Sequence, residues 1–115
     1  MEKAKAALIL FIAFCVCTIS CKKEKDSKVD CNTLSAAYTA NVKPIIVGNC
    51  LSSGCHNAGS TNGDFNTYAG LKTSADNGSL NKKVVQDKSM PPTGSLSQDD
   101  RNKIQCWVSA GAPNN

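Results

Sequence analysis

Two cysteines and a histidine lie close together near the middle of the chain, in the segment Cys50-Leu51-Ser52-Ser53-Gly54-Cys55-His56. Two thiols at this spacing can form a disulfide, ligate a metal ion or bond to an organic group. An imidazole that directly follows the second thiol can ligate a metal at the same place. His56 is the only histidine of the chain, so any chemistry that needs an imidazole must use this residue.

A cysteine followed at once by histidine suits covalent attachment of haem, in which two thiols bond to the porphyrin and the histidine ligates the iron. Such motifs usually have two residues between the cysteines, whereas this chain has four. The Ser-Ser-Gly sequence of residues 52–54 is flexible enough to bulge outward and leave both sulfurs near the ring. The residues alone leave a second interpretation open, a disulfide between Cys50 and Cys55 with His56 as a bystander.

Met90 is the candidate for a second iron ligand. It is the only methionine besides the initiator, and it lies in the segment Ser89-Met90-Pro91-Pro92. Pro91 favours an extended conformation at Met90 and stiffens the loop, so a thioether could be presented to iron at little cost in entropy. The alternative is that Met90 fills a gap in the hydrophobic core.

Apolar residues recur at spacings of four, four and three before the first of these cysteines, which is typical of one face of an amphipathic helix. They are Leu34, Tyr38, Val42 and Ile45. Pro44 is expected to kink this helix or to restart it. Residues 51–63 are rich in Ser, Gly and Asn and predict a loop. A short helix is predicted from Thr67 to Thr73.

A final helix is predicted after Ser97, a good N-cap, with two aspartates in its first turn. Its apolar face consists of Ile104, Trp107 and Val108. Gly111 and Pro113 end it. Residues 74–96 look mostly irregular, with a turn at residues 76–78. No repeat and no convincing strand is present, so the predicted fold class is all-α.

The N-terminal segment is typical of an export signal. A positively charged start precedes residues 6–19, an uncharged and mostly apolar run of 14 residues that is too short to span a bilayer comfortably. The run ends at Ser20-Cys21 and therefore resembles a bacterial lipoprotein signal, although Thr18 stands where that signal prefers Leu. The resemblance implies that residues 1–20 are removed and that Cys21 is acylated. Ordinary secretory cleavage or an uncleaved anchor are the alternatives.

The mature chain would then consist of a charged, flexible tether, residues 21–30, and one small domain, residues 31–115. Only 18 of the 85 residues of this domain are Leu, Ile, Val, Met, Phe, Tyr or Trp, so it needs a disulfide, a metal or a cofactor for stability. Removal of residues 1–20 takes away two Lys and one Glu, and the net charge falls from +4 to +3. This mild charge, without a basic patch interleaved with aromatic residues, argues against nucleic-acid binding.

The seven cysteines divide by position. Two lie in the signal segment, one is the lipid candidate, and four remain in the domain: Cys31, Cys50, Cys55 and Cys106. Free thiols are uncommon in an oxidising compartment, so these four could form two disulfides. Alternatively, Cys50 and Cys55 hold haem and the other two pair. A zinc site that includes His56 is a third possibility, but adjacent Cys55 and His56 are poorly placed to chelate one ion.

Five segments together are similar in order and spacing to a class I cytochrome c domain of bacterial exported lipoproteins. They are Val42-Lys43-Pro44-Ile45-Ile46, Cys55-His56, Tyr68-Ala69-Gly70-Leu71-Lys72, Met90-Pro91-Pro92 and residues 104–113. The resemblance covers residues 34–113. It implies first and last helices that cross beside one covalent haem c, with His56 and Met90 as axial iron ligands. Because crossing helices would bring their cysteines together, it also implies a disulfide between Cys31 and Cys106.

These expectations favour an electron carrier over an enzyme, held at a membrane of the cell envelope through Cys21 and serving envelope redox partner proteins. Histidine and methionine together leave the iron no open position, so it can only change charge. Lysines 43, 72, 82, 83 and 88 could steer an acidic partner or simply form a solvated surface. The alternatives are a haem-based sensor or weak peroxidase, if Met90 is not a stable ligand, and a haem-free, disulfide-stapled interaction lipoprotein. No nucleophilic triad, carboxylate pair or phosphate-binding loop points to ordinary hydrolase or kinase chemistry.

Overall fold

The structure, a computed structural model, describes residues 28–94 and 96–115. Every regular element within these residues is helical and none is a strand, so the predicted all-α class is confirmed. The expected signal peptide and the acylated Cys21 lie outside the described residues. In chain order the elements are η1 (Tyr38–Val42), α1 (Lys43–Asn49), α2 (Tyr68–Asp76), η2 (Asn81–Gln86) and α3 (Gln98–Ser109).

The first helical stretch begins later than its apolar stripe predicts and changes type beside Pro44. Leu34 precedes the helix, because the backbone and side chain of Asp30 accept hydrogen bonds that hold the residues after it in a turn. η1 is a π-helix, in which the Lys43 N–H donates to the carbonyl of Tyr38. α1 restarts at Lys43 with Pro44 in its first turn, where the missing N–H leaves no helical hydrogen bond unmade.

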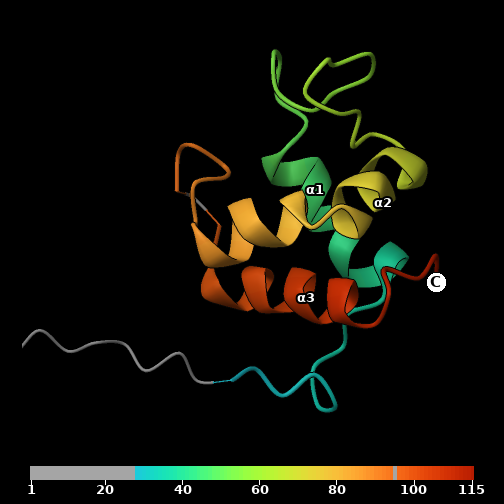
Figure 1. The fold of residues 1–115 in the computed structure, drawn as a ribbon, viewed down its shortest axis with the longest axis vertical. Helices are drawn as coiled ribbons and strands as arrows, with labels where there is room; N and C mark the ends of the chain where they lie inside the picture. Colours follow the sequence, from blue (N-terminus) through green and yellow to red (C-terminus); the bar gives the residue numbers. More distant parts are fainter. Residues whose placement is uncertain (1–27, 95) are drawn as a thin grey trace, which may run out of the picture.

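α3 is the longest helix of the described residues and packs against two other elements. Its N-cap Ser97 accepts a hydrogen bond from the Asp100 N–H at 3.1 Å, as the sequence predicts. Ile104 and Trp107 are fully buried, whereas Val108 is half-buried. α3 packs against η1 on one side and against η2 on another, and Figure 1 shows η2 lying along it. The first and last helical elements are therefore in contact.

An aromatic cluster fixes that contact. The rings of Tyr38 in η1 and Trp107 in α3 are stacked, with centroids 5.7 Å apart, and Tyr68 of α2 packs edge-on against Tyr38 at 5.0 Å. The hydroxyl of Tyr68 donates to the carbonyl of Ala112 at 2.8 Å, and the indole N–H of Trp107 donates to that of Pro113 at 2.9 Å. Three helices and the C-terminal segment thus share one apolar centre.

The segment predicted to be irregular, residues 74–96, contains a helix. η2 buries Val84 against α3, and Leu80 is buried just before it, so both contribute to the core. A short element with so few apolar positions has no periodic stripe, which explains why the prediction missed it. The turn expected at residues 76–78 is present at the end of α2, where Gly78 adopts φ +79°.

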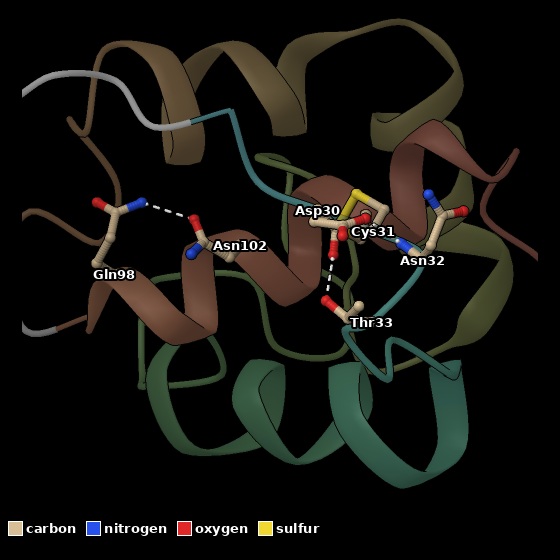
Figure 2. Close-up of a disulfide and its surroundings, with 7 residues drawn as sticks. Asp30, Cys31, Asn32, Thr33, Gln98 and Asn102 are labelled. Carbon is tan, nitrogen blue, oxygen red and sulfur yellow. Dashed lines mark hydrogen bonds between the residues drawn. A yellow bond between two sulfur atoms is a disulfide. The ribbon is translucent and has the colours of Figure 1, made fainter.

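Cys31 and Cys106 form a disulfide, the pairing expected from the sequence, with their Cα atoms 5.3 Å apart. Figure 2 shows that it joins the segment before η1 to α3. Cys31 is exposed, whereas Cys106 is buried within the helix. The bridge closes a loop of 75 residues. By chain entropy, such a loop stabilises the fold by about 4 kcal/mol, because it restricts the unfolded chain.

We expect Cys31→Ala to lower the free energy of unfolding by up to about 4 kcal/mol. The exposed position of Cys31 means that the change removes the cross-link without opening a cavity. Urea unfolding measures the effect, and the wild-type chain in a reducing agent is the matched control, since it loses the same bond without a substitution. Equal unfolding midpoints for the oxidised wild type and the variant would contradict a stabilising bridge.

Candidate functional site

The four site residues selected from the sequence line one cavity. Its volume is about 630 Å³, and Cys50, Cys55, His56 and Met90 all contribute to its wall. They come from the end of α1, the loop that follows it, and the loop between η2 and α3. Apolar parts of the wall come from Phe65, Leu80, Val84, Pro91 and Pro92. Most ligand pockets have volumes of about 300–1,000 Å³, so this cavity is large enough for a cofactor.

The loop between the two cysteines is closed at its base. Cys50 caps α1, and its carbonyl accepts a hydrogen bond from the His56 N–H at 3.0 Å. Within the loop the Cys55 N–H donates to the carbonyl of Ser52 at 2.9 Å, and Gly54 adopts φ +78°, which favours glycine. Residues 52–54 are therefore exposed at the rim of the cavity, which Ser52 and Gly54 line together with the two cysteines, whereas Leu51 packs against the core.

The imidazole of His56 is held on two sides. Its Nδ1 lies 3.2 Å from the carbonyl oxygen of Gly63, and its ring stacks on Phe65 with centroids 4.0 Å apart and an angle of 2° between planes. Because a carbonyl can only accept, Nδ1 must carry the proton in this hydrogen bond. The lone pair of the neutral ring is then on Nε2, the nitrogen available to a metal.

Neither thiol of the cavity is bonded to another sulfur in this structure. Burial raises the pKa of the Cys50 thiol to about 11, and the charge of nearby Cys55 adds to the rise. Cys50 is therefore protonated at neutral pH and is a weak nucleophile. This environment does not favour the activated thiolate that nucleophilic catalysis requires.

The loop that carries Met90 is fixed by hydrogen bonds to its backbone. The Met90 N–H donates to the carbonyl of Lys83 at 3.1 Å, and the Arg101 guanidinium of α3 donates to the carbonyl of Met90 at 3.3 Å. Pro91 is buried and joined to Met90 by a cis peptide bond. The Met90 side chain is half-buried, packs partly against the core and also lines the cavity.

The expected steering lysines differ in their surroundings. Lys72 pairs with Asp76 at 2.5 Å and Lys82 with Asp87 at 2.9 Å, so these two cations are partly neutralised. Lys83 lines the cavity and is exposed, which leaves it the best placed of the set to influence a ligand or a partner there.

The structure leaves too few residues close together for the zinc site that the sequence allowed. Among residues 28–94 and 96–115, no group of three or more His, Cys, Asp or Glu side chains is arranged to hold a metal ion. Two of the cysteines considered for zinc, Cys31 and Cys106, are bonded to each other.

Three site residues were missed in the sequence. Phe65 and Gly63 hold His56, and Arg101 holds the Met90 loop. A signal was present for two of them, since Phe65 is the only phenylalanine after the apolar N-terminal run and Arg101 is the only arginine of the chain. Gly63 acts through its backbone carbonyl, which every residue type supplies, so its role left no signal.

Comparison of the chain with protein-family models, curated proteins and solved structures found no match. The site therefore has to be interpreted from its own geometry. In the part of the chain that the structure describes, no helix is long and apolar enough to cross a membrane.

Gly70 lets the loop that holds His56 pack closely against α2. A Cβ atom at this position would lie 1.7 Å from the carbonyl oxygen of Asp64, a backbone atom that cannot move alone. We expect Gly70→Ala to destabilise the fold by about 1–3 kcal/mol, because this clash outweighs the gain in helix propensity of about 0.5–1 kcal/mol. The matched control is Gly48→Ala in α1, where a Cβ meets nothing within 4 Å. Equal unfolding midpoints for the two variants in urea would contradict the tight approach.

The pKa of Cys50 gives a test of the cavity in the haem-free chain. Because that pKa is about 11, the rate at which iodoacetamide alkylates Cys50 should keep rising about tenfold per pH unit from pH ~7 to ~10. In the same chain unfolded in urea, the rate should level off near pH ~9, since an exposed thiol titrates near ~8.5. Peptide mapping identifies the labelled cysteine. Identical pH profiles in the folded and unfolded chains would show that Cys50 is not buried.

Proposed function

We propose that this protein is an electron carrier that holds one covalent haem c in the cavity. The observation that carries the proposal is that Cys50, Cys55, His56 and Met90, all selected from the sequence, line the same cavity. Cys50 and Cys55 would bond to the porphyrin through thioethers. His56 and Met90 would ligate the iron. When bound, haem supplies an iron centre that can take up and release one electron.

The residues present fit such a group. The cavity has a volume of about 630 Å³ with apolar side chains in its wall, which suits a large and mostly apolar ring. The hydrogen bond from His56 Nδ1 to the Gly63 carbonyl leaves Nε2 as the free nitrogen, the usual arrangement of a metal-ligating histidine. The unpaired thiols of Cys50 and Cys55 at the cavity wall remain available to form thioethers.

The fold is compatible with the same proposal. An all-α domain in which the first and last helical elements pack together is what a cytochrome c-like arrangement requires. The proposed fold family rests on this contact and on the five sequence segments, two of which contribute Cys55, His56 and Met90 to the cavity.

The chain is expected to carry electrons rather than transform a substrate. Two protein ligands would leave the iron no position for a substrate, and the Cys50 thiol is protonated at neutral pH. A sensor or weak peroxidase would need Met90 to leave the iron. Since two backbone hydrogen bonds hold Met90, we favour the carrier.

The proposed location and partner follow from the sequence. Cys21 would be acylated and would anchor the domain to a membrane of the cell envelope, at the end of the tether of residues 21–30. The partner would be an envelope redox protein with an acidic surface near its own cofactor. Lys83, exposed at the cavity, is the cation best placed to meet it.

The absorption spectrum of the purified protein tests the proposal. We expect a reduced c-type spectrum, haem staining that survives denaturing electrophoresis, and the far-red charge-transfer band of a methionine-ligated ferric haem. Met90→Ala should keep the stain and lose the far-red band, because the thioether is removed and the attachment is not.

Each part of this experiment has its own contrary result. Colour lost from the protein band on denaturation would exclude thioether attachment, and a purified protein without any haem spectrum would favour the haem-free lipoprotein. A stained band with no far-red band in the wild type would favour the sensor or peroxidase. Pro92→Ala, a change at the same cavity wall that removes no ligand, is the matched control and should keep both signals.

A further inference from the structure

We propose that Arg101 is a positioning residue that keeps the Met90 thioether at the haem iron. The inference rests on the proposed function, because it assigns a role toward the iron that Met90 would ligate. Arg101 does not line the cavity and acts only through the loop. Without it, the loop should release Met90 and open the iron to external ligands.

Arg101 is unusual for a charged residue in this fold. It is 4 % exposed and is the only charged side chain buried among the described residues. The ion pairs found in that part of the chain are formed by lysines, and none includes Arg101. Burial of a cation without a carboxylate partner is unfavourable, so its hydrogen bonds must offset the lost hydration. A position on the buried face of α3 would be filled more simply by an apolar side chain.

The hydrogen bonds of Arg101 connect three segments. From α3, its Nη1 donates to the carbonyl of Val84 in η2 at 2.5 Å and to the carbonyl of Met90 at 3.3 Å. Val84 lies in the last turn of η2, where carbonyl groups lack helical partners. The guanidinium therefore spans the gap between the end of a helix and the loop that carries the candidate ligand.

Backbone hydrogen bonds also hold the loop that carries Met90. The carbonyl of Lys83 accepts the N–H groups of both Ser89 and Met90, at 2.9 and 3.1 Å. The N–H of Met90 is thus bound to η2 and its carbonyl to α3. Arg101 thus ties Met90 to α3, the helix that also holds the buried Trp107 and the disulfide at Cys106.

A simpler role has to be separated from this one. Arg101 could act only as a cap for η2 through Val84, in which case its loss would destabilise the whole domain and leave Met90 on the iron until the domain unfolds. A positioning role makes a different prediction. Its loss should weaken the hold on Met90 in the folded protein, under conditions where α3 and η2 remain intact.

Imidazole binding to the ferric, haem-loaded protein distinguishes the two roles, since imidazole must displace Met90. We expect Arg101→Lys and Arg101→Met to bind imidazole at least about tenfold more tightly than the wild type, which corresponds to about 1.4 kcal/mol. Lysine keeps the charge, but its ammonium nitrogen is one bond closer to the main chain than Nη1 of Arg101, which makes both hydrogen bonds, so it should not restore the wild-type affinity. Lys103→Met, on the same helix and paired with Asp99, is the matched control and should change the affinity less than about twofold.

The same substitution in a Met90→Ala background completes the test. With no thioether to displace, Arg101→Lys should leave imidazole affinity unchanged. An affinity that rises equally in both backgrounds would mean a loosened cavity and would overturn the positioning role. So would Arg101 variants that keep the far-red band and wild-type affinity while unfolding at lower urea concentration.

Failure of the proposed function would look different. A wild type that lacks the far-red band and binds imidazole as tightly as Met90→Ala would overturn methionine ligation, and the inference with it. If Arg101→Met does not load haem, Arg101→Lys carries the comparison. If neither variant folds in the presence of haem, Arg101 is a structural residue of the domain and the inference is wrong.

Discussion

The stacking of Trp107 on Tyr38 is the contact on which the rest of this domain depends. It joins α3 to η1, and η1 continues directly into α1. Tyr68 adds α2 to the same cluster. Aromatic pairs of this kind contribute about 0.5–1.5 kcal/mol beyond the area they bury. In a domain with so few large apolar residues, three rings at one point form much of the core.

The cavity lies where this framework ends and hydrogen-bonded loops begin. Cys50 lies at the end of α1, at the cavity. From there the chain runs to Phe65 without a regular element and is held by individual hydrogen bonds. Backbone carbonyls do most of this work: that of Gly63 orients His56, and that of Asp64 packs against Gly70. The geometry of the site is therefore set by main-chain atoms, while its chemistry is set by side chains.

This division explains which features could be predicted from the sequence. The helices after Thr67 and Ser97 were predictable because a polar side chain caps each one. η2 was not, because tertiary packing of Val84 rather than a periodic stripe stabilises it. Cys50, Cys55, His56 and Met90 were found from their chemical type, their spacing and the resemblance. The burial of Arg101 could not be foreseen, because a cation that directly follows a pair of aspartates normally faces water.

The bulge at residues 52–54 has a consequence for how such sites diversify. The hydrogen bond between the Cys50 carbonyl and the His56 N–H closes the loop at its base, so residues at the exposed tip can be added or removed without moving the ends. Lengthening a loop is inexpensive, since each doubling adds only about 0.6 kcal/mol of closure entropy. Insertions at the tip are therefore nearly neutral to selection. A sequence pattern that requires a fixed number of residues between the two cysteines therefore tests a loop length that can vary. It does not test the hydrogen bond between Cys50 and His56 that closes the loop.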